Sequence, residues 1–185
     1  MSTTTDRMPL SVATRLASTL AALFVPRCLR IEVAGSIRRK KPTIGDVELV
    51  CIPLPKLDLF GAPDPAGGTL LDPMLDSLCA EKKLERVKGG EKYRQYKLVK
   101  AGCNLDLFLC TPLTWAVNLT IRTGDSNFSH RLVTPKSQGG FCPDGYRFSG
   151  ARLWKDGHPV DLAEEADLFA ALGLPWVEPW NRNST

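Results

Sequence analysis

Two acids, Asp46 and Glu48, stand two positions apart in a mostly apolar run that ends at Ile52. Such a run predicts a strand. Because successive strand residues point to opposite faces, the two carboxylates project together while Val47 and Leu49 face the other way. Paired carboxylates near phosphate groups are typical ligands of Mg²⁺. The acid pair therefore suggests metal-assisted chemistry, provided that a phosphate site lies beside it.

An anion site is indeed predicted just before this strand. Residues 31–34 read as a buried strand that leads into Gly35 and Ser36, where glycine allows backbone N–H groups close to an anion and serine adds a hydroxyl donor. Four cationic residues follow at 38–41, and the chain turns through Gly45. A solvated hairpin with surface charges is the alternative reading. The combination of features favours a phosphate-and-metal site.

A third acid, Asp106, lies in the expected strand 104–110, opposite a face made of Leu105, Leu107 and Leu109. Taken alone, Asp106 is equally consistent with a functional role and with a position on a solvent-exposed face of the sheet. If its strand neighbours the strand 46–52, the three carboxylates converge, and two Mg²⁺ ions can be shared among them.

Composition sets the broad class of the protein. A chain of 185 residues with 43% hydrophobic content can bury a core in one domain or in two small ones. Its net charge is +4, and the cations gather at 38–41, 82–88 and 92–100, which suits a polyanionic partner better than a membrane. Six cysteines without a Cys-x-x-Cys pair predict free thiols in a reducing compartment, so we expect a cytoplasmic protein without zinc.

The hydrophobic pattern and the turn signals predict an α+β fold. The expected elements are a helix from Pro9 to before Pro26, a loop at 53–73, a helix at 73–84 with Leu84 inward and a basic tail, strands at 92–99 and 104–110, helices at 111–122 and 126–133, strands at 146–148 and 152–154, and a final helix capped by Asp161 with Glu164. No segment is apolar for long enough to span a membrane.

Several of these motifs together resemble the nucleotidyltransferase site of family X DNA polymerases. The resemblance is carried by Gly35-Ser36-x-Arg38-Arg39, by Gly45-Asp46-x-Glu48 and by Asp106. It continues with Thr123-Gly124 and Phe128, which are similar to the family's Thr-Gly-x-x-x-Phe segment, and with residues 164–176, which resemble its C-terminal thumb segment. The likeness covers nearly the whole chain, and its second half narrows the match to family X.

The resemblance implies a role for each matched residue. Asp46, Glu48 and Asp106 would hold two divalent metals, Mg²⁺ with Mn²⁺ as a possible substitute, and Asp106 would also activate the primer 3′-hydroxyl. The expected nucleotide contacts are Gly35, Ser36, Arg39, the Gly45 backbone and Arg7 for the triphosphate, and Thr123 and Gly124 for the sugar and base. The expected DNA contacts are Lys92 and Arg131.

The resemblance also implies a domain plan and shows where this chain differs. We expect a nucleotidyltransferase palm at 1–112, with a mixed β-sheet flanked by helices, and a small α+β thumb at 113–185. Nothing in the chain matches the family's N-terminal lyase and helix–hairpin–helix domains, so a minimal, monomeric polymerase is expected. Glu48 replaces the usual aspartate, and Ile121 and Arg122 replace an aromatic pair.

The leading hypothesis is a DNA polymerase that adds deoxynucleoside triphosphates to gapped DNA or to a primer–template in DNA repair. The alternative is a nucleotidyltransferase that modifies a small molecule, an RNA end or a protein. A non-catalytic nucleic-acid-binding module is a third class, and the three acids argue against it. The thumb-like segment favours the polymerase, because a small-molecule transferase has no need to grip a duplex.

Overall fold

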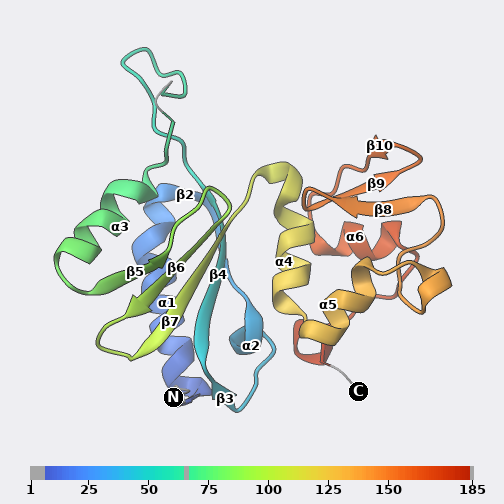
Figure 1. Ribbon diagram of the computed structural model, residues 1–185, viewed down its shortest axis with the longest axis horizontal. Helices are drawn as coiled ribbons and strands as arrows, with labels where there is room; N and C mark the ends of the chain where they lie inside the picture. The colour runs from blue at the N-terminus through green and yellow to red at the C-terminus, as the bar shows by residue number, and fades with distance from the viewer. Residues whose placement is uncertain (1–6, 65–66, 184–185) are drawn as a thin grey trace.

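The computed structural model describes residues 7–64 and 67–183 and has two parts joined by a helix, α4 (Figure 1). The strands are β1 (Met8–Pro9), β2 (Cys28–Val33), β3 (Thr43–Ile44), β4 (Asp46–Pro53), β5 (Leu84–Lys88), β6 (Tyr93–Leu98), β7 (Cys103–Leu109), β8 (Tyr146–Ser149), β9 (Arg152–Lys155) and β10 (His158–Pro159). The α-helices are α1 (Leu10–Phe24), α2 (Gly35–Arg38), α3 (Leu71–Ala80), α4 (Trp115–Thr123), α5 (Ser126–Val133) and α6 (Glu165–Ala171). Short 3₁₀ helices lie at Val25–Arg27, Pro112–Thr114, Lys136–Gln138 and Pro179–Asn181.

The first part is built on a five-stranded mixed sheet with the order β2-β4-β7-β6-β5. Strands β4 and β7 run parallel, and the other neighbouring pairs are antiparallel. In the β4–β7 pair, Glu48 is in register with Asp106 and Asp46 with Asn104. The condition for three converging carboxylates, that their strands be neighbours, is therefore met.

One face of this sheet is a closed hydrophobic core. Val47, Leu49, Leu105 and Leu107 are fully buried there, in one cluster with residues of α1 and α3. Helix α1 contributes an apolar stripe at intervals of three and four residues, made of Ala13, Ala17, Leu20 and Phe24. This spacing places all four on one side of a helix. The sequence predicted this helix correctly.

The opposite face of the sheet is divided between packing and polar groups. Toward the ends of β4 and β7, Val50 and Phe108 pack under Trp115 and Leu119 of α4. Toward the starts of the same strands, Asp46, Glu48 and Asp106 occupy this face. The alternation of side chains that builds the core on one side therefore gathers the acids on the other.

The second part packs α4, α5 and α6 with the three-stranded sheet β8–β10 (Figure 1). Its core includes Leu132, Leu153 and Leu168, and Ala116 and Val117 of α4 belong to the same cluster. Because α4 also packs on the large sheet through Trp115, this helix belongs to the cores of both parts. The described helices include none that is long and apolar enough to cross a membrane.

Two expectations about local structure were wrong. Helix α3 ends at Ala80, and Leu84 opens strand β5 because Lys82 adopts a left-handed backbone (φ 57°) that turns the chain. Helix α6 is capped by Glu164 with Asp167, three residues later than the predicted Asp161 with Glu164. Strand β10 was not predicted. All six cysteines are free thiols, as expected.

Candidate active site

Asp46, Glu48 and Asp106 lie on the neighbouring strands β4 and β7, on the face of the sheet opposite α1 and α3. Glu48 and Asp106 are register partners, and Asp106 is only 9% exposed. The Glu48 carboxyl group packs against the backbone of Gly35, so a Cβ atom at position 35 would lie 2.5 Å from Glu48 Cδ. Gly35 also has a φ of 60°, a conformation that favours glycine. Both observations explain why the chain needs glycine at the point where β2 leads into α2.

Burial and nearby negative charges raise the pKa values of two of the acids. Burial raises the pKa of Glu48 to about 7, with further contributions from the negative charges of Asp46 and Asp106. The pKa of Asp46 is also raised, first by burial and then by Asp106, although Arg7 and Arg39 partly oppose this. The protein alone does not neutralise this negative charge, and a bound cation would lower the free energy of the site.

Asp106 is held by two neutral donors from strand β6. The Tyr93 hydroxyl donates to Oδ1 of Asp106 at 2.7 Å, and Nε2 of Gln95 donates to the same oxygen at 2.9 Å. Sequence reasoning missed both donors. The signal was available, because Tyr93 and Gln95 are two apart on a strand that turns back at Gly102 to pair with β7.

The acids suit a divalent metal in their chemistry, but their side chains do not form a ready-made site. Across residues 7–64 and 67–183, no group of three His, Cys, Asp or Glu side chains is gathered so that it would hold a metal ion. The donors are nevertheless hard carboxylate oxygens on one face of neighbouring strands, which is the ligand type that Mg²⁺ prefers. The residues therefore fit Mg²⁺ by donor type and charge.

A cavity of about 590 Å³ adjoins the acids and carries most of the predicted phosphate-binding residues. It is lined by Arg7, Ser36, Arg39, Lys41, Pro42, Thr43, Gly45, Asp46 and Glu48. Three cations and a serine hydroxyl thus face the same space as two of the acids. Such a lining suits a polyphosphate accompanied by metal ions.

A second cavity of about 410 Å³ shares Arg39 and Glu48 with the first. Its other lining residues are Ile121, Arg122, Gly124, Asp125, Ser126 and Ser129. Gly124 is required here by packing, because a Cβ atom at this position would collide with the ring of Phe128 and lie 2.7 Å from Ser129 Oγ. This close approach explains the spacing of glycine and phenylalanine in the Thr-Gly-x-x-x-Phe segment.

Thr123 is fully buried and holds two arginines in place, Arg38 in α2 and Arg39 at the C-terminal end of that helix. Its hydroxyl accepts a hydrogen bond from Arg38 at 2.7 Å, and its carbonyl oxygen accepts one from Arg39 at 2.7 Å. Thr123 therefore supports the cavities through Arg39. The sequence prediction that Thr123 itself lies under the nucleotide remains a proposal.

A buried ion-pair network ties α2 to the second part of the molecule. Arg38 makes a bidentate pair with Glu165, at 3.0 and 2.6 Å, and Arg182 pairs with the same carboxylate. Glu165 is 4% exposed, and Arg182 is fully buried. No local pattern predicts this network, because its members lie far apart in the chain and Arg38 is one of a run of cationic residues.

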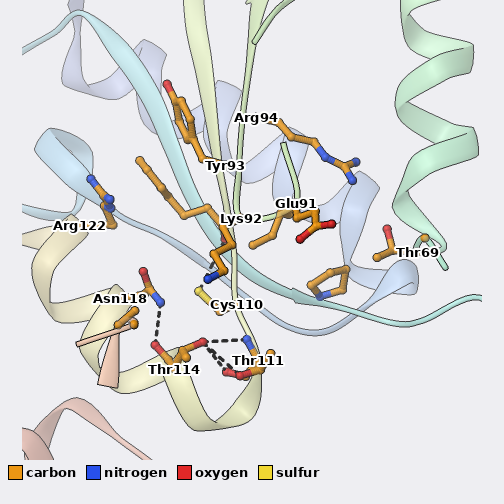
Figure 2. A pocket seen from close by; sticks show the side chains of 16 residues that line it. Thr69, Glu91, Lys92, Tyr93, Arg94, Cys110, Thr111, Thr114, Asn118 and Arg122 are labelled. Atoms are coloured by element: carbon orange, nitrogen blue, oxygen red, sulfur yellow. Dashed lines mark hydrogen bonds between the residues drawn. The ribbon is translucent and has the colours of Figure 1, made fainter. Parts of the chain in front are cut away.

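A third cavity of about 730 Å³ lies between strand β6, the ends of β4 and β7, and helix α4. Figure 2 shows Lys92 and Tyr93 on one side of it and Arg122 and Asn118 on the other. The Arg122 guanidinium lies over the ring of Phe108, 4.1 Å from its centroid. Arg122 thus stands between the second and third cavities and lines both.

The two predicted DNA contacts lie apart from each other. Lys92 is exposed and lines the third cavity. Arg131 is exposed on α5, where its guanidinium lies 4.3 Å from the centroid of the Phe141 ring. Whether either residue touches DNA stays a prediction.

Similarity to known proteins agrees with this architecture. Residues 142–183 match the family model described as DNA polymerase beta thumb. Two solved structures of Leishmania infantum polymerase beta are similar to the chain. The ternary P/T complex has 22% identity and a TM-score of 0.71, covering 97% of this chain and 77% of that one. The ternary gap complex has 20% identity and a TM-score of 0.69, covering 96% and 71%. Comparison with curated proteins finds no match.

The chain therefore has a mixed α+β fold similar to that of polymerase beta, and its residues 142–183 match the thumb of that polymerase. The resemblance predicted from the sequence motifs is confirmed at this level.

Proposed function

We propose that the protein is a DNA polymerase of the family X type that adds deoxynucleotides to a primer 3′-hydroxyl and fills short gaps. One observation carries the proposal: three acids on neighbouring strands adjoin a cavity lined by Arg7, Ser36, Arg39 and Lys41. The thumb match favours a nucleic-acid substrate over a small molecule. The similar polymerase beta structures are ternary complexes, one P/T and one gap, which supports the choice of substrate.

The cavities suggest how a nucleotide would lie. The triphosphate would occupy the first cavity, where Arg7, Arg39 and the Ser36 hydroxyl offer donors to phosphate oxygens. The sugar and base would occupy the second cavity, beside Ile121 and Gly124. Because both cavities share Arg39 and Glu48, the α-phosphate would lie next to the acids.

Asp46, Glu48 and Asp106 are the residues that would hold two divalent ions. When bound, such ions supply charge neutralisation on the phosphates and lower the pKa of a coordinated hydroxyl. The remaining contribution of the protein is positioning: Arg39 is fixed by the Thr123 carbonyl, and Asp106 is fixed by two donors from β6. Phosphoryl transfer depends mainly on such positioning and on electrostatic stabilisation.

We further propose the palm–thumb boundary at residues 112/113, before α4. The cations of the third cavity, Lys92 and Arg122, would lie along the DNA backbone near the primer end. Lys92 and Tyr93 are consecutive in the chain, and Tyr93 contacts Asp106, so a strand bound in this cavity would lead toward the acids.

A primer-extension assay tests the proposal. The substrates would be labelled DNA with a one-nucleotide gap, an open primer–template, and single-stranded RNA, each with all four nucleotides and Mg²⁺ or Mn²⁺. We expect extension that depends on the template and is most efficient on the gap. Template-independent labelling, or transfer to RNA alone, would favour the alternative nucleotidyltransferase.

A further inference from the structure

The environment of Asp106 differs from that of the other two acids. Asp46 and Glu48 face Arg7 and Arg39, whereas Asp106 receives two hydrogen bonds from uncharged side chains, both on Oδ1. In the described residues, no hydrogen bond reaches its Oδ2 atom. The carboxylate is thus held from one side, and its second oxygen is left for a ligand.

We propose that Tyr93 and Gln95 are positioning residues that fix the Asp106 carboxylate, so that Oδ2 is presented to a divalent ion and to the primer hydroxyl. This inference rests on the proposed function. It adds two residues to the site that neither the sequence motifs nor the phosphate-facing cavities include.

The sheet register delivers both donors to one oxygen. Gln95 is the direct cross-strand partner of Asp106 in the antiparallel β6–β7 pair, and Tyr93 is the partner of Phe108 two residues further along. Residues 93 and 95 point to the same face as residue 106. Tyr93 therefore reaches Asp106 diagonally and Gln95 reaches it directly, at 2.7 and 2.9 Å.

Packing fixes the hydroxyl of Tyr93 in place. Its ring stacks on the Phe108 ring, with centroids 5.2 Å apart and planes inclined by 24°. The Arg122 guanidinium lies over the same Phe108 ring, so strand β6, strand β7 and helix α4 all contribute to the stack. A hydroxyl held in this way loses little additional entropy when it orients the carboxylate.

Neutral donors suit this task better than a cation would. Asp106 is 9% exposed, so its ionised form needs hydrogen bonds to replace lost water. A lysine or arginine at position 93 or 95 would supply them but would also repel a divalent ion. A hydroxyl and an amide orient the carboxylate and leave its full negative charge for the metal.

The test uses Tyr93→Phe and Gln95→Met, which remove one donor each and keep side-chain size, together with the double variant. Tyr96→Phe is the matched control, because it deletes the same hydroxyl from the same strand on the opposite, core-facing side. Free Mn²⁺ measured by electron paramagnetic resonance gives metal affinity without DNA or nucleotide. Single-nucleotide gap filling gives kcat and KM, and thermal unfolding monitors the fold.

We expect each single variant to weaken Mn²⁺ binding by about tenfold and to lower kcat by a similar factor, with more loss in the double variant. KM for the nucleotide should change by less than about twofold, because Asp46, Glu48 and Arg39 still hold it. Tyr96→Phe should keep wild-type Mn²⁺ affinity and kcat.

Wild-type Mn²⁺ affinity and kcat in the folded double variant would overturn the inference. So would a rise in KM with unchanged kcat, since this would assign the pair to nucleotide binding. If the double variant fails to fold, the single variants decide by the same criteria. If the wild-type protein extends no primer, the proposed function fails, whereas the Mn²⁺ measurement still tests the pair.

Discussion

The guanidinium of Arg38 and the carboxylate of Glu165 form a bidentate ion pair, although 127 positions separate them in the chain. Arg38 ends the turn of helix that follows Gly35, and Glu165 begins the helix α6. The same Arg38 also donates to Thr123 at the end of α4. The phosphate-facing segment of the first part is thus anchored on the second part of the molecule.

We expect Glu165→Gln to lower the free energy of unfolding by about 3 kcal/mol or more at pH 7, because Arg182 would remain buried without a counter-charge. Asp76→Asn is the control. Asp76 pairs with Arg86 at an exposed position, so its loss should cost less than about 1 kcal/mol. Urea unfolding of the three proteins measures both values, and equal effects of the two changes would contradict the account.

The stabilisation by Glu165 should also depend on pH. Burial alone would raise its pKa, but hydrogen bonds and ion pairs with Arg38 and Arg182 outweigh burial and lower it below the usual 4.5. The contribution is therefore complete above about pH 5 and is lost as the pH falls through the lowered pKa. The difference between wild type and Glu165→Gln should shrink as the pH falls below about 4.

Glu48 should destabilise the metal-free protein at alkaline pH. Its pKa in the folded protein is about 7, against 4.5 when unperturbed, so the folded state holds a proton that the unfolded state has lost. In EDTA, Glu48→Gln should match wild type near pH 4.5 and exceed its free energy of unfolding by up to about 3 kcal/mol at pH 8. Equal pH profiles of the two proteins would show that the ionised Glu48 carboxylate does not destabilise the folded state.

Discrimination against ribonucleotides should be weak. In family X polymerases an aromatic pair before the Thr-Gly motif crowds the sugar, but here Ile121 and Arg122 line the second cavity, and the Arg122 guanidinium lies on Phe108. Steric exclusion of one small group is worth only a few kcal/mol. Ile121→Tyr should therefore raise the deoxy-to-ribo ratio of kcat/KM.

Measurement of that ratio for wild type, Ile121→Tyr and Arg122→Ala separates two versions of the site. A high wild-type ratio that falls in Arg122→Ala would mean that the arginine itself excludes ribonucleotides, contrary to this prediction.

DNA binding should be weak, independent of sequence and steeply dependent on salt, because the cations at 82–100, together with the thumb, would contact the phosphates. Lys92→Gln should reduce the slope of log affinity against log salt by about one unit. Arg15→Gln is the control, since Arg15 lies exposed on α1, which covers the other face of the sheet. Fluorescence anisotropy with gapped DNA at several salt concentrations measures the slope; an unchanged slope for Lys92→Gln would place Lys92 off the DNA.

Local patterns were sufficient to predict much of the acid site. The period of two in residues 46–52 and 104–110 identified both strands and the face on which each acid lies. That β4 and β7 are neighbours, with Glu48 opposite Asp106, is a tertiary fact that the strands alone do not contain. The motif resemblance implied only that the three acids act together, and the register shows that their strands are neighbours.

Contacts made over long sequence separations escaped prediction. No role was predicted for Glu165 or Arg182 from the sequence, and nothing local indicates that both are buried around Arg38. The strand β5 was mistaken for the end of a helix because Leu84 continues the helical spacing, whereas the left-handed turn at Lys82 ends that helix. Pairing with β6, a non-local interaction, then fixes Leu84 in the sheet.

The central claim is that Asp46, Glu48 and Asp106 form a metal-dependent polymerase site. Single-turnover incorporation on one-nucleotide gapped DNA, comparing wild type with Asp106→Ala and Asp46→Asn, tests it most directly. Wild type should add one template-matched nucleotide in Mg²⁺. Asp106→Ala should bind nucleotide–Mg²⁺ but incorporate it at least about a hundredfold more slowly, and Asp46→Asn should incorporate none while remaining folded. Incorporation by Asp46→Asn at a rate near that of wild type would contradict the assignment.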